Sequence, residues 1–185
     1  MHRLTRILTR ATRDIAPEYF RLNIDGGDPV YRERVYCYEL YHRMRIRWPH
    51  DTDYRLNGEI DKAAHPILMQ LGAAHAKPDF LVHRPGHMAG NHAIIEVKTF
   101  RAGNAEIRSD LEKLALFLNV VGYQRAIYLV FGEGADLQVL NRIANVANQI
   151  PNLPPVEVWL HQEAGTAARC AATLQAEPVA LDAIG

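Results

Sequence analysis

The chain has 185 residues, 48% of them hydrophobic, and its net charge at pH 7 is zero because 21 lysines and arginines balance 21 aspartates and glutamates. This length suits one well-buried domain, and the apolar content excludes an intrinsically disordered chain. No apolar run approaches the roughly 20 residues that a membrane-spanning helix needs, so we expect no membrane partner. Cys37 and Cys170 lack metal-ligand spacing and predict a reducing, cytoplasmic location without a disulfide framework.

Residues 1–27 are predicted to form an N-terminal amphipathic extension. Leu4, Ile7, Leu8 and Ala11 recur at helical spacing and would face inward. Arginines crowd the first fifty residues (Arg3, Arg6, Arg10, Arg13, Arg32, Arg34, Arg43, Arg45 and Arg47). Zero net charge counts mildly against a nucleic-acid partner, but a local basic surface can still bind phosphate, with strong salt dependence. An ordinary solvated helix face is the alternative interpretation.

Asp28 and Pro29 are predicted to cap and open a helix that runs to about Arg45, before Trp48 and Pro49 end it. Its expected buried stripe comprises Val30, Cys37, Leu40, Tyr41 and Met44. Glu39 lies at the edge of that stripe, where a helix packed on a sheet would direct it at a site on the sheet. An exposed helical glutamate is an equally good interpretation.

Residues 54–64 alternate loosely and predict a first strand, with Gly58 as a bulge. Glu59 and Asp61 would share one face of this strand, because side chains two apart point the same way. They are candidates for a further acid at a site, but a solvated strand face is the more common outcome for such a pair.

Residues 78–98 predict a hairpin of two strands. The apolar runs 80–82 and 93–95 flank a turn that contains two glycines and a proline. If the turn centres on His87 and Met88, the numbers of opposed residues sum to 175, which sets Asp79 directly across from Glu96. Lys98 lies two residues beyond Glu96 and therefore shares its face.

Two carboxylates directly opposite each other destabilise a sheet, so something should neutralise them. A hard divalent cation is the best candidate, because Mg²⁺ is typically held by one or two carboxylates, several waters and phosphate oxygens. A surface salt bridge in which Asp79 and Glu96 share Lys98 is the alternative. Zinc is disfavoured although three histidines lie in or beside the turn, because the local cysteine of a four-ligand site is missing; these are His83, His87 and His92.

The C-terminal half predicts a helix, a buried strand and a second helix. Ser109 and Glu112 have capping-box spacing and would open the first helix, which ends near Gly122. Residues 125–131 form a near-continuous apolar run, typical of a strand buried on both faces and, after a right-handed crossover, parallel to the Glu96 strand. Asp136 would cap the second helix, with Leu137, Leu140, Ile143, Ala144 and Ala147 inward. Residues 156–160 read as a last strand and residues 163–185 as a tail or helix.

Pro78-Asp79, followed by Glu96-Val97-Lys98 and preceded by the helical acid Glu39, resembles the PD-(D/E)xK nuclease superfamily over roughly residues 30–132. The resemblance implies an α/β fold with a restriction-endonuclease-like core over residues 28–162. That core is a mixed β-sheet flanked by helices, in the order α-β-β-β-α-β.

By this resemblance, Asp79, Glu96 and the carbonyl of Val97 would hold one Mg²⁺, with Mn²⁺ as a substitute. Glu39 would complete a second metal position or orient water. Lys98 would orient or deprotonate the attacking water, or screen charge on the phosphate. Lys113 matches a helical residue that contacts phosphate in some members, but we favour a solvated lysine there.

The sequence thus predicts a Mg²⁺-dependent DNA endonuclease of restriction, antiviral (phage) defence, or DNA repair and recombination. The alternative is a nuclease-fold protein without catalysis that serves as a DNA-binding or assembly subunit. RNA as substrate stays open. Cutting both strands of a duplex would most simply need a homodimer, and membership of a defence complex is a further expectation.

Overall fold

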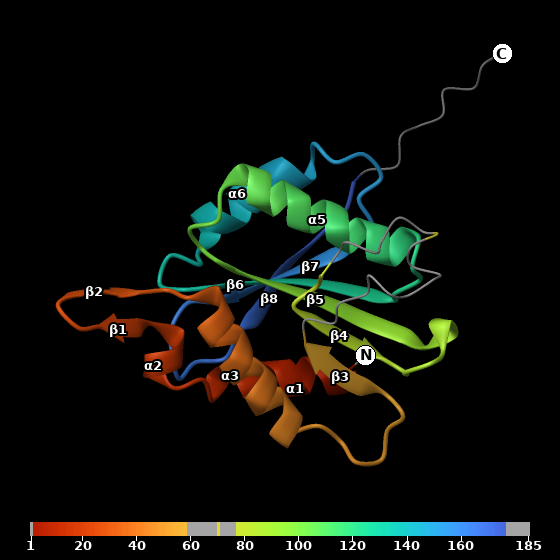
Figure 1. Ribbon diagram of the computed structural model, residues 1–185. Coiled ribbons are helices and arrows are strands. Elements are labelled where there is room, and N and C mark those ends of the chain that lie inside the picture. The colour runs from red at the N-terminus through yellow and green to blue at the C-terminus, as the bar shows by residue number, and fades with distance from the viewer. Residues whose placement is uncertain (1, 59–69, 71–76, 177–185) are drawn as a thin grey trace.

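The computed structural model describes residues 2–58, 70 and 77–176. Its centre is one six-stranded mixed sheet of strand order β3-β4-β5-β6-β7-β8, with a separate two-stranded hairpin near the N-terminus (Figure 1). The hairpin pairs β1 (Leu22–Ile24) with β2 (Gly27–Val30). The sheet comprises β3 (Arg55–Gly58), β4 (Phe80–His83), β5 (Asn91–Thr99), β6 (Arg125–Phe131), β7 (Val156–His161) and β8 (Arg169–Leu174).

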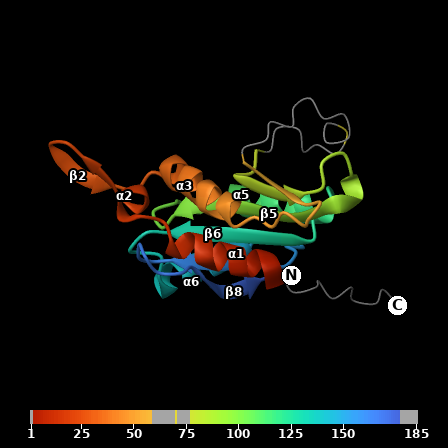
Figure 2. The same ribbon diagram turned by 90° about the horizontal axis from the view of Figure 1, so that it is seen from below.

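Helices cover both faces of the sheet. On one side lie α1 (His2–Arg13) and α3 (Glu33–Ile46), with the short α2 (Pro17–Phe20) between them in sequence. On the other side lie α5 (Asn104–Asn119) and α6 (Leu137–Ala147), as Figures 1 and 2 show. A single turn of 3₁₀-helix, η1 (Met88–Gly90), lies between β4 and β5. The predicted class, a mixed β-sheet flanked by helices, is confirmed, and α3-β3-β4-β5-α5-β6 follows the predicted order of elements.

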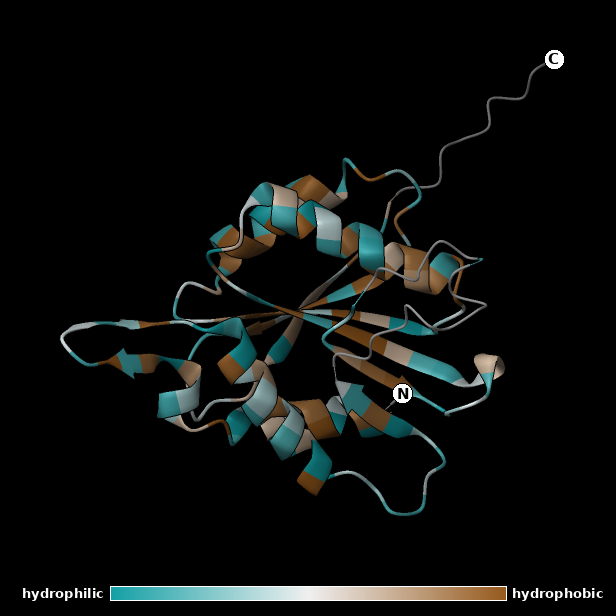
Figure 3. Ribbon diagram, viewed as in Figure 1, coloured by the Kyte–Doolittle hydropathy of each residue, from teal (hydrophilic) through white to brown (hydrophobic). Residues whose placement is uncertain are grey.

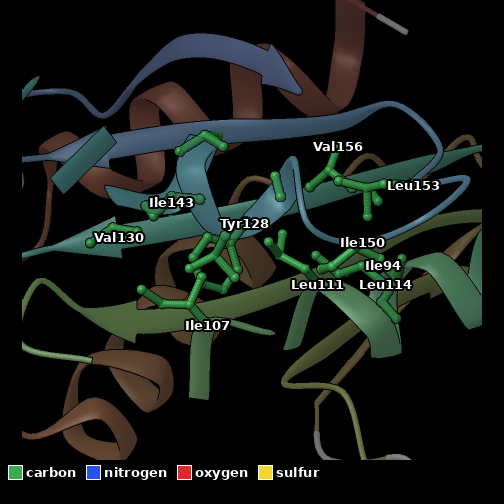
Figure 4. Close-up of a cluster of buried hydrophobic side chains, with 14 of the residues drawn as sticks. Ile94, Ile107, Leu111, Leu114, Tyr128, Val130, Ile143, Ile150, Leu153 and Val156 are labelled. Atoms are coloured by element: carbon green, nitrogen blue, oxygen red, sulfur yellow. The ribbon is translucent and has the colours of Figure 1, made fainter. Parts of the chain in front are cut away.

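The hydrophobic core has two halves, one on each face of the sheet. The α5 and α6 side is built around Ile107, Leu111, Leu114, Tyr128 and Ile143, and Figure 4 shows their side chains meeting between the helices and the strands. Apolar residues accordingly concentrate on the strands and on the inward sides of the helices in Figure 3. Strand β6 is buried along its whole length and runs parallel to β5, as its apolar run predicted.

The second half of the core joins α1 and α3 to the sheet. Leu4, Leu8 and Ala11 of α1 are buried, which confirms the amphipathic helix. They belong to the same cluster as Leu40 of α3 and Val97 of β5. The N-terminal segment therefore packs on the same sheet that carries the predicted site.

The hairpin register is confirmed over its central part. Phe80 pairs with Ile95, Leu81 with Ile94 and Val82 with Ala93, so each pair sums to 175. The register shifts by one residue after Val82, where His83 faces Asn91 and η1 occupies the turn. Since that shift lies at the turn, it leaves the opposite end of the hairpin in the predicted alignment.

Two helix starts differ from the prediction. Asp28 and Pro29 lie in β2, and α3 begins only at Glu33; Gly26, at φ 72°, makes the tight turn that pairs β1 with β2. Helix α5 begins at Asn104, five residues before Ser109. Its first turn is closed by Glu106, whose Oε2 accepts a hydrogen bond of 2.7 Å from the backbone N–H of Gly103.

The C-terminal prediction was wrong in part. Strand β7 is not the last, because β8 pairs antiparallel with it at the sheet edge, in a segment that we expected to be a tail or helix. Its alanines and its half-exposed alternation give little strand signal. In α6, Asp136 does cap the helix, accepting from the N–H groups of Gln138 and Val139, but Leu137 is 66% exposed.

Three further observations concern membrane-spanning helices, the two cysteines and the predicted strand at residues 54–64. Within the described residues, no helix is long and apolar enough to cross a membrane. Cys37 and Cys170 are both free thiols, the first buried and the second exposed. Of the predicted strand 54–64, β3 accounts for the first part, and Glu59 and Asp61 lie outside the described residues.

Candidate active site

The candidate site forms where β5 extends past the start of β4. Strand β4 begins at Phe80, and Asp79 stands just before it. One carboxylate oxygen of Asp79, Oδ2, accepts a hydrogen bond of 2.7 Å from the backbone N–H of Val97. The two predicted segments are therefore joined at the point where the sequence placed their acids.

Glu96 lies on the α5 side of the sheet and is 1% exposed. Its Oε2 is 2.9 Å from Nζ of Lys113, and the same ammonium is 3.2 Å from Oδ1 of Asp110. Asp110 and Lys113 are one turn apart on α5, so both reach the strand from a single helix face. Lys113 is thus an ion-paired lysine rather than the solvated one that we favoured.

Lys98 makes its ion pairs away from Asp79 and Glu96. Its Nζ is 2.9 Å from Oε1 of Glu33, at the start of α3, and 3.7 Å from Oδ2 of Asp110. The expected alternative, in which Asp79 and Glu96 share Lys98, does not match these contacts. Instead α3 and α5 each supply an acid that the sequence analysis did not single out.

Glu33, Asp79, Glu96, Lys98, Asp110 and Lys113 together form what we call the acid–lysine cluster. Four carboxylates meet two ammonium groups, so the fully ionised cluster carries an excess of two negative charges. Within the described residues, Oε1 of Glu96 and Oδ2 of Asp110 are shielded from solvent and have no hydrogen-bond partner. Oδ2 of Asp110 still lies 3.7 Å from the ammonium of Lys98, whereas a buried carboxylate oxygen without any donor, such as Oε1 of Glu96, is rare in folded proteins.

Burial disfavours the charged form of both predicted metal ligands. It raises the pKa of Asp79 to about 6, with the charge of Glu33 adding to the effect. Burial also raises the pKa of Glu96 well above its usual value, and the charge of Asp79 raises it further. For Lys98, burial acts against the ammonium, but its hydrogen bond to Glu33 and the charge of Asp110 outweigh it and raise the pKa. Burial acts against the ammonium of Lys113 too, but Glu96 and Asp110 outweigh it and raise its pKa, so both lysines stay charged beside acids that resist ionisation.

Glu39 is not brought to this cluster. It is 8% exposed, and its Oε1 pairs with Nε of Arg43 on the next turn of α3 at 2.5 Å. The acid of α3 that contacts Lys98 is Glu33, six residues earlier. The sequence signal for Glu33 was its place in the first turn of the helix, which the misplaced helix start concealed. Asp110 was concealed in the same way, because the helix was expected to open only at Ser109, whereas it begins at Asn104.

The donors of the cluster are of the kind that Mg²⁺ takes, hard oxygens of carboxylates and a backbone carbonyl. In the part of the chain that the structure describes, however, no three acidic, histidine or cysteine side chains are already arranged to hold a metal. Lys113 occupies one oxygen of Glu96, which leaves Oε1 of Glu96 and the second oxygen of Asp79 as the available ligands. This set fits Mg²⁺, which needs only one or two carboxylates beside its waters.

The histidines of the hairpin do not converge on a zinc site. Nε2 of His83 lies 3.0 Å from Oδ1 of Asn57 on β3, whereas Nδ1 of His92 lies 3.3 Å from Oε1 of Gln124 at the other side of β5. Both contacts join the hairpin to neighbouring segments of the chain.

Comparison with known proteins identifies no family for this chain. No protein-family model matches the chain, and neither does any curated protein sequence. Among solved structures, the chain is similar to SfsA of Pyrococcus furiosus, solved in complex with Ca²⁺. The identity is 12% over 82% of this chain and 68% of that one, and the TM-score is 0.35. At that level the match carries no argument about the site.

Proposed function

We propose that this protein is a metal-dependent nuclease of the PD-(D/E)xK type that hydrolyses phosphodiester bonds of DNA. The observation that carries the proposal is the acid–lysine cluster, in which Asp79 and the Glu96-Val97-Lys98 segment meet at the start of β4, with two carboxylate charges left over when all four acids are ionised. One bound Mg²⁺ would balance that charge. Such an ion would also contact Oε1 of Glu96, a buried oxygen that has no hydrogen-bond donor within the described residues.

The backbone of Val97 supports its predicted part in holding the metal. In a strand, the N–H and C=O of one residue point to the same edge, and the N–H of Val97 is bonded to Asp79. The C=O of Val97 therefore faces the same side. Extending the hairpin register sets Pro78 opposite, and a proline has no N–H to donate to that carbonyl. The motif thus supplies two carboxylates and a carbonyl to which the opposed proline cannot donate.

A Mg²⁺ ion bound there would polarise the phosphate and lower the pKa of a bound water. The residues of the chain have separate tasks. Asp79 is oriented by the N–H of Val97, and Glu96 is fixed on one oxygen by Lys113. Lys98 is held between Glu33 and Asp110, which favours its charged form, so its role is to stabilise negative charge on the phosphate rather than to take a proton.

The test is a cleavage assay on labelled duplex, single-stranded and branched DNA, with RNA as control, with and without Mg²⁺. We expect Asp79→Asn, Glu96→Gln and Lys98→Ala each to lower the single-turnover rate by about 100-fold or more. Glu112→Gln is the matched control, because Glu112 lies on α5 near Asp110 with its side chain 54% exposed. Wild-type cleavage by Lys98→Ala would remove the role assigned to that lysine.

A second candidate, a nuclease-fold DNA-binding or assembly subunit without catalysis, is favoured by one observation. Lys98 and Lys113 already neutralise part of the cluster from within, at 2.9 Å from Glu33 and Glu96 respectively. Titration calorimetry with Mn²⁺ separates the two candidates. If the protein is a nuclease, binding of Mn²⁺ should release or absorb heat, and Asp79→Asn should abolish that signal. A subunit without a metal site should give no heat of binding.

The assembly that we propose for double-strand cleavage is a two-fold homodimer, since each chain carries one acid–lysine cluster. Sedimentation of the protein with and without duplex DNA tests this. A monomer bound to each duplex would limit the enzyme to nicking. Membership of a defence complex and location in the cytoplasm are parts of the same proposal.

A further inference from the structure

The arginines of α1 form a hollow that the proposed nuclease site does not use. Arg3, Arg6 and Arg10 of α1, with Arg47 at the end of α3, line a cavity of about 370 Å³ whose floor includes Ile7 and Pro49. We call it the arginine pocket. Helix α1 lies in front of the sheet in Figure 2, which views the molecule of Figure 1 from below.

Two of these arginines already have acidic partners. Arg3 pairs with Asp51 and Arg47 pairs with Asp14. Arg6 and Arg10 are exposed and, within residues 2–58, 70 and 77–176, have neither an ion pair nor a hydrogen bond from their side chains. The arginine pocket therefore keeps an excess of two positive charges.

The local energetics of α1 do not explain this arrangement. Arg6 and Arg10 are four residues apart on one helix, where like charges repel, and α1 has no acid in its first turn. Arg3 and Arg6 also lie near the N-terminus of the helix, the end where its dipole disfavours positive charge. A bound anion would remove both penalties, because guanidinium groups bind phosphate oxygens in pairs.

An aromatic cleft shares a wall with the arginine pocket. Trp48, Tyr54 and His92 line this cleft of about 80 Å³, and Arg3, Ile7 and Pro49 border both hollows. The rings are fixed: Nε1 of Trp48 donates a 3.0 Å hydrogen bond to the carbonyl of Tyr54, and the rings of Tyr54 and His92 are 5.3 Å apart. A cationic hollow beside partly exposed aromatic rings is the arrangement by which proteins hold unpaired bases and their phosphates.

The position of the arginine pocket suits a nucleic acid that also reaches the acid–lysine cluster. Arg47 is fourteen residues after Glu33, so the length of α3 separates pocket and cluster by about 21 Å at 1.5 Å per residue. That distance is within the reach of a single strand several nucleotides long.

We propose that the arginine pocket binds a backbone phosphate of single-stranded nucleic acid while the adjoining base stacks on the rings that border the aromatic cleft. The choice of nucleic acid over a free phosphate rests on the proposed function and on the cleft, because inorganic phosphate has no apolar part to place there. Binding at this surface needs no divalent metal, which separates it from cleavage.

The experiment measures binding in EDTA, with a fluorescein-labelled 12-nucleotide DNA strand, the same sequence as duplex, and inorganic phosphate as competitor. The variant Arg6→Gln/Arg10→Gln should weaken binding of the single strand at least tenfold. It should also lower the slope of log affinity against log salt concentration by about the amount that one to two phosphate contacts contribute. Arg13→Gln is the matched control, since Arg13 is an exposed arginine of the same helix outside the pocket; it should change the affinity less than twofold.

A second readout tests the aromatic cleft. The protein has two tryptophans, and Trp159 is 2% exposed, so a ligand at the cleft should quench Trp48. We expect the single strand to quench the emission, Trp48→Phe to abolish the quenching, and inorganic phosphate to leave the emission unchanged.

Equal losses of affinity in Arg13→Gln and Arg6→Gln/Arg10→Gln would overturn the inference. They would show that the positive charge of the whole helix attracts the strand, and not the arginine pocket. Tighter binding of the duplex, or phosphate binding as strong as that of the strand, would overturn the choice of ligand. Arg6→Lys/Arg10→Lys keeps the charge and should lose part of the affinity, which guards against misfolding of the glutamine variant. Binding without cleavage supports this inference while refuting nuclease activity.

Discussion

The ammonium of Lys113 on α5 lies 2.9 Å from Oε2 of Glu96 on β5, so a helix supplies the counter-charge of a strand carboxylate that is almost fully buried. The same lysine is 3.2 Å from Asp110. This pairing makes Lys113 part of the acid–lysine cluster. It also places the lysine in competition with any cation that binds Glu96.

Replacing Lys113 by methionine should destabilise the metal-free protein by about 2 kcal/mol, because a buried carboxylate loses its partner. The same change should tighten Mn²⁺ binding, since the competing ammonium is gone. Urea unfolding with and without Mn²⁺ measures both effects, and added Mn²⁺ should restore the lost stability. Arg108→Met, which removes a surface ion pair with Glu112 and an exposed hydrogen bond to Gln149, should cost less, about 1 kcal/mol or below. Weaker Mn²⁺ binding by Lys113→Met would show that the lysine organises the ligands instead.

The acid of α3 that serves the site can be decided by two matched variants. Glu33→Gln should lower single-turnover cleavage about tenfold, because Lys98 loses its 2.9 Å partner and is held less firmly. Glu39→Gln should keep the rate within about twofold and affect thermal stability only, since Glu39 pairs with Arg43. The opposite ranking would return the role to Glu39, where the sequence placed it.

The strand pair that carries the site could be predicted because its pattern is local. Two apolar runs around a glycine-containing turn fix a register, and the sum of 175 then aligns Asp79 with Glu96 without further information. The error of one residue at the turn fell on the far side of the hairpin. Short-range periodicity is therefore sufficient for the part of the site that one hairpin supplies.

The acids from the helices could not be predicted because they depend on where each helix begins. Placing the start of α3 at Asp28 concealed that Glu33 lies in its first turn, and the start of α5 was placed five residues too late. Asp110 was then only the residue next to the expected cap, Ser109, although it is a buried partner of two lysines. The face of a helix that packs on the sheet is decided by contacts between distant segments, so a local sequence pattern cannot predict it.

Helix α6 gives a matched pair that tests this difference between pattern and packing. The sequence placed Leu137 in the buried stripe, but it is 66% exposed, whereas Val139, which was left out of the stripe, is 9% exposed. Leu137→Ala should change the free energy of unfolding by about 0.5 kcal/mol or less, and Val139→Ala should lower it by about 1–2 kcal/mol. Guanidinium unfolding followed by circular dichroism measures both. A larger loss for Leu137→Ala would restore the sequence-based orientation of the helix.

The stability of the metal-free protein should depend on pH through Asp79. Burial, together with the charge of Glu33, raises the pKa of this carboxyl from 3.8 to about 6, so the folded state takes up a proton between these values while the unfolded chain does not. Stability therefore falls as pH rises from about 4 to above 6, by up to about 3 kcal/mol for this group. Asp79→Asn should remove the loss, because the amide oxygen can still accept from the N–H of Val97 and carries no charge.

The variant should consequently be more stable than the wild type at pH 7.5, equally stable below pH 4, and inactive. Comparing the two proteins at each pH cancels the titration of the other acids. Saturating Mg²⁺ should reverse the order at pH 7.5, since the metal stabilises only the ionised carboxylate. A variant that is no more stable than the wild type at pH 7.5 without metal would show that the charge of Asp79 is already compensated in the folded protein, and a metal would then not be needed to balance it.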